Sequence, residues 1–147
     1  MKAFVAVALL AVLAGCASKG KSDAEIYSEA AKAHVATLPA GQGKFSFPST
    51  KILSHGLISD NLAIAAGGGA NAAQLKQALL MAKAGGDSGF LIIGAATSLD
   101  VAVIKNAVDE LDLKGLRIYY AGGESQKDDV RSAVEKAQAQ FQYISVQ

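Results

Sequence analysis

The chain has 147 residues, of which 51% are hydrophobic and 18% are charged, so it is apolar enough to fold around a core. Its 14 basic and 13 acidic side chains leave a formal net charge of +1, which argues against nucleic-acid binding through bulk charge. This length suits a single domain of ordinary size.

The N-terminus has the pattern of a signal peptide. Lys2 precedes an apolar run over 3–13, and these eleven residues are too few to cross a bilayer, since a spanning helix needs about 20. The run ends in Leu13-Ala14-Gly15-Cys16, which resembles the lipobox of bacterial lipoproteins, where signal peptidase cuts before the cysteine and the thiol is lipidated. The resemblance implies that residues 1–15 are removed and that acylated Cys16 anchors the chain in a lipid bilayer.

The cysteine content agrees with this interpretation. Cys16 is the only cysteine, so an intramolecular disulfide cannot form, and acylation accounts for a thiol in an oxidising compartment. The lipoprotein resemblance further implies sorting to the outer membrane, because Ala17 and not aspartate follows the cysteine. The alternative is an ordinary secretory signal in which Cys16 has no role. Removal of residues 1–15 also takes away Lys2 and leaves the mature chain formally neutral.

Residues 16–22 are interpreted as the lipidated cysteine with a short tether, and residues 23–147 as one periplasmic α/β domain. Strands alternate with helices along this domain, which predicts a largely parallel or mixed sheet of about four or five strands with helices packed on it. The predicted helices cover 23–37, with a capping box at Ser22 and Glu25, and then begin near Asn71, Thr97 and Ser125; the predicted strands are 44–48, 62–66, 90–95, 116–121 and 141–146. We expect 90–95 to be central, because it is apolar on both faces, and 141–146 to be an edge.

Three loops are predicted to follow strands and to meet beside helix N-termini at one edge of the sheet, where a ligand could bind. The candidate binding residues in these loops are Gly67, Gly68, Gly69 and Asn71, then Thr97 and Ser98, and then Gly122 and Gly123. Residues 67–72 also fit G-x-G-x-x-A, a pattern that cradles phosphate between a strand and a helix, but the next strand lacks the acidic residue of dinucleotide sites. Tight turns require the same glycines, so both interpretations stay open.

The sequence predicts no catalytic residue, no metal site and no cofactor. His34 and His55 do not have the spacing of metal ligands. Ser54, His55 and Asp60 are the residue types of a hydrolase triad, but the chain has no G-x-S-x-G nucleophile elbow. We therefore expect a protein that acts by binding and not by catalysis.

The domain is also similar to the OmpA-like peptidoglycan-binding domains, which are periplasmic and alternate strands with helices. In that family the strand corresponding to 90–95 runs into a G-H-T-D-like segment, and the next helix carries an arginine. Gly94-Ala95-Ala96-Thr97 keeps the glycine and the threonine but lacks the histidine and the aspartate, and residues 97–113 contain no arginine. The resemblance implies cell-wall binding as an alternative to a protein partner in an envelope assembly.

A protein partner would require an exposed apolar or aromatic surface. Tyr119, Tyr120 and Phe141 near the sheet edge are one candidate, and the apolar side of the first helix is another. Burial of the tyrosines under helices is the competing expectation, because tyrosine is often largely buried.

Overall fold

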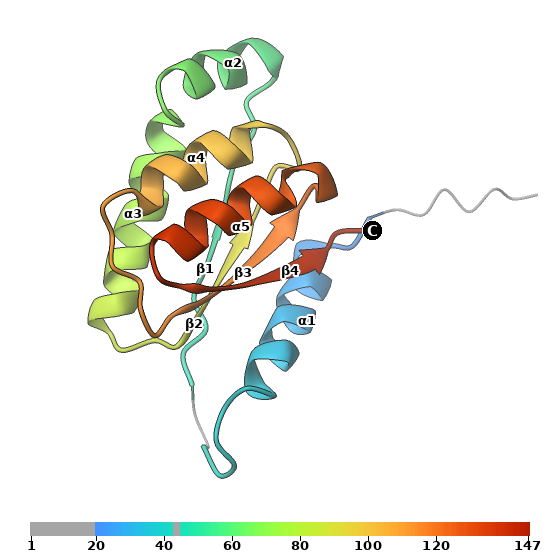
Figure 1. Ribbon diagram of the computed structural model, residues 1–147. Helices are drawn as coiled ribbons and strands as arrows, with labels where there is room; N and C mark the ends of the chain where they lie inside the picture. Colours follow the sequence, from blue (N-terminus) through green and yellow to red (C-terminus); the bar gives the residue numbers. More distant parts are fainter. Residues whose placement is uncertain (1–19, 43–44) are drawn as a thin grey trace, which may run out of the picture.

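A computed structural model describes residues 20–42 and 45–147 of the chain, so the predicted signal peptide and Cys16 lie outside the described residues. The fold is a parallel four-stranded sheet in the order β1-β2-β3-β4 (Figure 1). In chain order the elements are α1 (Asp23–Val35), β1 (Ser49–Lys51), α2 (Leu57–Ala65), α3 (Gly69–Ala84), β2 (Gly89–Ile93), α4 (Leu99–Val108), β3 (Arg117–Gly122), the 3-10 turn η1 (Glu124–Gln126), α5 (Lys127–Lys136) and β4 (Gln140–Ser145). The predicted α/β class is confirmed.

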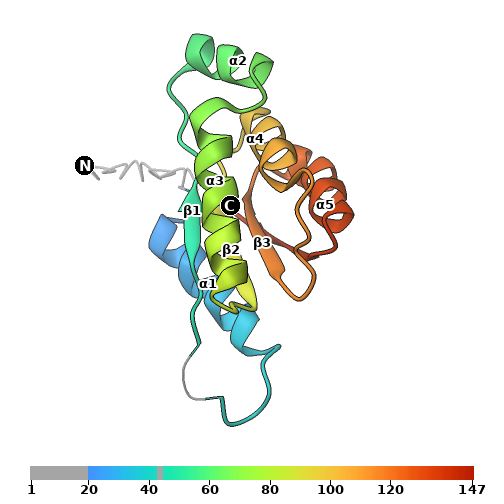
Figure 2. The ribbon, with the colours of Figure 1, turned by 90° about the vertical axis from the view of Figure 1, so that its left-hand side faces the viewer.

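The sheet separates two layers of helices. Figure 2 shows α1 on one face and α4 and α5 on the other, with α3 along the side of β1 and β2. Side chains of β2 alternate between the two sides, with Leu91 in the core under α1 and Phe90 in the core under α3, α4 and α5. All five residues of β2 are buried, and β4 lies at an edge, so both strand placements predicted from the sequence are confirmed.

Helix α1 forms as its capping box predicts. The Ser22 hydroxyl accepts a hydrogen bond from the Glu25 N–H at 3.3 Å, and the Glu25 carboxylate accepts one from the Ser22 N–H at 2.7 Å. One residue earlier, the Lys21 N–H donates to the Val146 carbonyl at 2.9 Å. Helix α1 therefore begins beside the carboxyl end of β4 and runs antiparallel to the strands.

Two predicted strands are wrong. Residues 62–66 belong mostly to α2, because an apolar run of five residues fits either a strand or a helix and periodicity alone cannot distinguish them. The second wrong prediction is the strand 44–48, because the first strand of the sheet, β1, pairs with β2 only from Ser49 onward. Pro48 contributes only its carbonyl, which accepts from the Leu91 N–H at 2.9 Å, since proline has no N–H to donate to a ladder.

Candidate functional site

Two of the three predicted ligand loops follow strands, and the third does not. Residues 94–98 follow β2, and residues 122–125 begin with the last residue of β3, so both segments lie at the carboxyl edge of the sheet. The third segment, residues 67–71, contains the end of the connection from α2 and the first residues of α3, since the strand predicted before it is helical. The strand-to-helix context that a phosphate-binding G-x-G-x-x-A requires is therefore missing here.

The glycines of the third loop allow close packing between α3 and α4. The backbone of Gly68 is left-handed, with φ +94°, and a Cβ at this position would lie 2.7 Å from the Val103 Cα of α4. The Gly67 carbonyl accepts a hydrogen bond from the Asn106 side chain, and a Cβ on Gly69 would lie 3.8 Å from the Ala63 Cβ. Contacts between helices account for this glycine run without any ligand.

Asn71 makes a paired hydrogen bond to the chain that precedes α2. Its side-chain oxygen accepts from the Leu53 N–H at 3.2 Å, and its side-chain nitrogen donates to the Leu53 carbonyl at 2.9 Å. The side chain thus satisfies both polar backbone groups of one residue. Asn71 therefore holds the segment leading into α2, and its amide is already engaged by this contact.

A buried carboxylate accepts hydrogen bonds from the backbone of the loop after β2. Asp100 is fully buried and accepts hydrogen bonds from the N–H groups of Ala95, at 2.7 Å, and Ala96, at 3.1 Å. The Tyr120 hydroxyl donates a third bond to it at 2.6 Å. Burial raises the pKa of Asp100, although these hydrogen bonds oppose the rise, and burial also raises the pKa of Tyr120. The N–H groups that could hold an anion in this loop already bind Asp100.

The exposed part of that loop is small. Thr97 and Ser98 are exposed, and the Thr97 hydroxyl accepts from the Leu99 N–H at 3.3 Å. The spacing of Thr97 and Asp100 fits a capping box, but this box does not form, because the Asp100 side chain reaches back to the end of β2 instead. Sequence spacing alone does not show this contact, since Tyr120, which completes it, comes from a different strand.

The loop after β3 is filled by neighbouring side chains. The Gly122 carbonyl accepts a hydrogen bond from the Tyr143 hydroxyl at 2.9 Å. A Cβ on Gly122 would collide with the Tyr120 hydroxyl, and one on Gly123 would collide with the Gln126 side chain. Glycine is therefore required at both positions because a neighbouring side chain packs directly against the backbone there.

The three triad residue types do not form a catalytic relay. The Ser54 hydroxyl donates directly to the Asp60 carboxylate at 2.5 Å, and His55 donates through its backbone N–H at 2.9 Å. These hydrogen bonds hold the pKa of Asp60 below its ordinary value. The arrangement fixes the chain ahead of α2. A nucleophilic serine requires a base that an acidic side chain positions, and these three residues do not form that arrangement.

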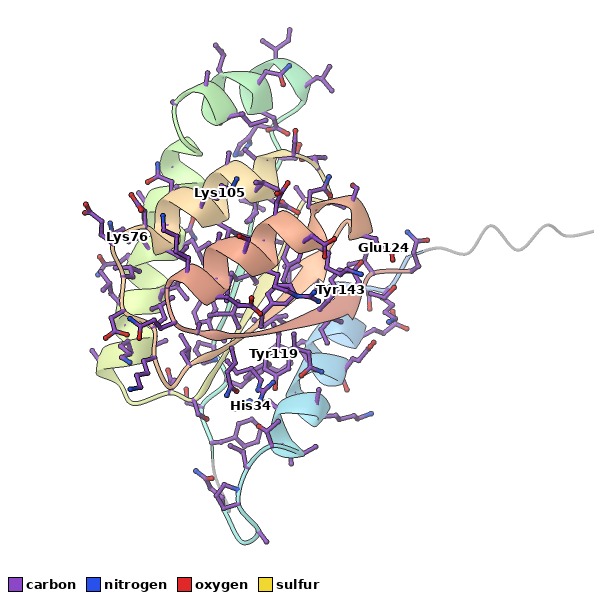
Figure 3. The ribbon with its side chains drawn as sticks, in the orientation of Figure 1. His34, Lys76, Lys105, Tyr119, Glu124 and Tyr143 are labelled. Carbon is purple, nitrogen blue, oxygen red and sulfur yellow. The ribbon has the colours of Figure 1, made fainter. Side chains whose placement is uncertain are left out.

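His34 is buried between α1 and the sheet. Figure 3 shows it beside Tyr119, whose hydroxyl lies 3.1 Å from the His34 Nδ1, and the Ser88 hydroxyl lies 2.9 Å from the Nε2. The ring also stacks on Phe47, with centroids 5.2 Å apart. Burial lowers the pKa of His34, and the charge of nearby Arg117 adds to the shift. Both ring nitrogens have protein partners, so His34 serves the packing of α1.

Open pockets lie away from the carboxyl edge. One of about 440 Å³ is lined by His34, Ser88 and Arg117 at the amino ends of the strands. Another, of about 760 Å³, lies where α4 and α5 end and is lined by charges of both signs, including Lys105 and Asp109. Within residues 20–42 and 45–147, no group of three or more His, Cys, Asp or Glu residues could hold a metal ion.

The most distinctive surface is on α2, which projects beyond the carboxyl edge of the sheet (Figures 1 and 3). Leu57 is 83% exposed, Ile58 80% and Leu62 68%. We call these three residues the α2 apolar surface. The single ionisable residue of α2, Asp60, is buried, so this surface carries no charge.

The sequence prediction placed the contact surface elsewhere. Tyr119 and Tyr120 are completely buried, and Phe141 is partly covered by the Arg131 guanidinium, which lies 5.2 Å from its ring centroid. These aromatic residues therefore do not form the exposed surface. The four-residue spacing of Ile58 and Leu62 is helical and was the available signal, but apolar residues were expected to lie in the core.

No protein-family model, curated protein or solved structure matches this chain. Among the residues that the structure describes, no helix is both long and apolar enough to cross a membrane.

Proposed function

We propose that this protein is a lipoprotein of the cell envelope, anchored in the outer membrane by acylated Cys16, with its α/β domain facing the periplasm. The observation that carries the proposal is the segment Leu13-Ala14-Gly15-Cys16, which ends an apolar run of signal-peptide length and contains the only cysteine of the chain. Small residues before the cysteine suit a protease cleft, and a thiol can take up a diacylglycerol group as a thioether.

The domain acts by binding, and the α2 apolar surface is its contact site. Exposed aliphatic side chains on a projecting helix lose unfavourable contact with water when a partner covers them. The glycine loops are weaker candidates, because Asn71 and the N–H groups of Ala95 and Ala96 already have partners within the domain. This balance of contacts favours a surface interaction over a small ligand held at the carboxyl edge.

The Cys16→Ser chain tests the anchor. It should fold normally, because position 16 precedes the domain, but it should fail to incorporate radioactive palmitate and should leave the membrane fraction. Ser18→Ala is the matched control, since it changes a neighbouring residue and leaves Leu13 to Cys16 intact. Membrane flotation and the intact mass of the mature chain are the measurements. Retention of the Cys16→Ser chain in membranes, or an unmodified cysteine in the parent chain, would reject the proposal.

A further inference from the structure

We infer that the α2 apolar surface inserts into the interfacial region of the same bilayer that holds Cys16, so that the domain contacts the membrane at two points. This inference rests on the proposed acylation of Cys16 and identifies the partner of the α2 apolar surface as lipid. Four steps support it: the length of the tether, the position of α2, the lack of charge on its exposed face, and the small size of that face.

The tether keeps the domain close to the membrane. Gly20, the first described residue, lies four positions after Cys16, a distance that extended chain can span over at most about 14 Å. From Lys21 onward the chain is fixed to the domain, because the Lys21 N–H donates to the Val146 carbonyl and its ammonium donates to the Ser145 carbonyl at 2.9 Å. A lipid on Cys16 therefore holds the carboxyl end of β4 near the bilayer.

Helix α2 lies at the same edge of the sheet as this attachment point. It follows the carboxyl end of β1, whereas Lys21 lies beside the carboxyl end of the parallel strand β4. Three strand spacings separate β1 from β4, which amounts to about 14 Å. Because α2 projects outward from this edge (Figure 1), one membrane plane can meet both α2 and the attachment point at Lys21.

The chemistry of α2 suits an uncharged lipid interface. Leu57, Ile58 and Leu62 can leave water without burying a charge, since Asp60 faces inward and accepts hydrogen bonds from Ser54 and His55. A helix also satisfies its own backbone polar groups, as insertion requires. No lysine or arginine lies in α2, so the contact should not depend on anionic lipids.

A lipid surface also fits the size of the patch. Stable protein interfaces bury about 800 Å² on each partner, which is far more than three aliphatic side chains on a nine-residue helix provide. A weak contact of this size becomes effective when the anchor already holds the domain at the bilayer, because tethering raises the local concentration of the second contact. A second copy of the chain is not attached to the domain by such a tether.

The chain contains no tryptophan, so a single introduced tryptophan reports one position. Ile58→Trp places it on the α2 apolar surface. Met81→Trp is the matched control, because Met81 is also exposed, at 66%, but lies near the end of α3, toward the opposite edge of the sheet. Both mature lipidated chains, which begin at Cys16, are reconstituted into phosphatidylcholine vesicles with or without brominated acyl chains, and with or without phosphatidylglycerol.

The Ile58→Trp chain should show blue-shifted emission and quenching by brominated lipid, equally with and without phosphatidylglycerol. The Met81→Trp chain should emit as in water and remain unquenched. Adding Leu57→Ser and Leu62→Ser to Ile58→Trp should reduce the quenching. A chain that floats with the vesicles while its tryptophan stays unquenched overturns the inference and leaves the anchor intact. A chain that does not float overturns both proposals, and a concentration-dependent blue shift without lipid overturns the inference in favour of a second copy.

Discussion

The Tyr120 hydroxyl donates a 2.6 Å hydrogen bond to the Asp100 carboxylate, and this contact joins β3 to the first turn of α4 inside the protein. The same carboxylate accepts from the N–H groups of Ala95 and Ala96. One acidic side chain therefore satisfies the polar backbone where β2 ends and connects two adjacent strand-to-helix junctions.

Asp100→Ala should destabilise the domain by about 3 kcal/mol or more, because two backbone N–H groups and the Tyr120 hydroxyl lose their common acceptor in a buried place. Tyr120→Phe, which removes one donor and leaves the two backbone bonds, should cost about 1 kcal/mol. Urea unfolding of both variants gives the comparison. Equal losses in the two variants would show that the backbone bonds to Asp100 contribute little.

His34 should make the domain less stable in acid. Its pKa is lowered in the folded state, so below the unfolded pKa of about 6.5 the unfolded chain takes up more protons than the folded chain. This contribution to stability is full above that pH and declines as the pH falls from there toward the folded pKa. His34→Gln should remove it.

The measurement is the urea midpoint of the parent and His34→Gln chains at about pH 7.5 and about pH 5.5. The parent should lose more stability than the variant between the two conditions. His55→Gln is the matched control, because His55 is the other histidine and lies in an exposed segment. A parental loss that His34→Gln does not reduce would place the acid-sensitive group elsewhere.

Gly68→Ala should cost about 3 kcal/mol or more, because a methyl group there meets the backbone of α4 as well as the strain of a left-handed residue. Gly115→Ala separates the two causes, since Gly115 has φ +90° with no atom within 4 Å of the added Cβ, and it should cost about 1 kcal/mol. Thermal unfolding measures both. Similar losses would mean that α4 yields to the added methyl group.

Asn71→Ala should loosen the segment that leads into α2 without unfolding the domain. The two hydrogen bonds between the Asn71 side chain and the Leu53 backbone disappear. Hydrogen exchange at residues 53–56 should therefore accelerate, while exchange in β2 stays unchanged. Asn71→Asp keeps the acceptor for the Leu53 N–H and loses the donor to its carbonyl, which predicts an intermediate rate. Unchanged protection at Leu53 in Asn71→Ala would contradict this role.

Local signals predicted most of the fold correctly. The Ser22 and Glu25 pair marked the start of α1, and the apolar run around Leu91 marked a central strand, because each feature depends on neighbours in the sequence. The segment around Leu62 was predicted wrongly as a buried strand, because hydrophobicity was taken to mean burial, whereas α2 exposes its apolar residues.

The candidate site was less accessible from the sequence, because it depends on contacts between distant residues. Asp100 looked like a helix cap, and only the approach of Tyr120 from β3 shows the hydrogen bonds that it makes. The pattern around Gly68 fitted a tight turn as well as a phosphate loop, and only the contact with Val103 of α4 shows why this position requires glycine. Spacing within one segment does not indicate what packs on it from another part of the fold.

The hydrogen bond from Lys21 to Val146 joins the first and last parts of the described chain, and this sets how the domain would respond to force. Tension applied ahead of Gly20 would first load this bond and the hydrogen bond from the Lys21 ammonium to the Ser145 carbonyl. Helix α1 would then peel away from Ile144 and Leu91, while the packing among α3, α4 and α5 on the opposite face would stay intact. Mechanical unfolding from the N-terminus should accordingly proceed in two steps, with α1 released first.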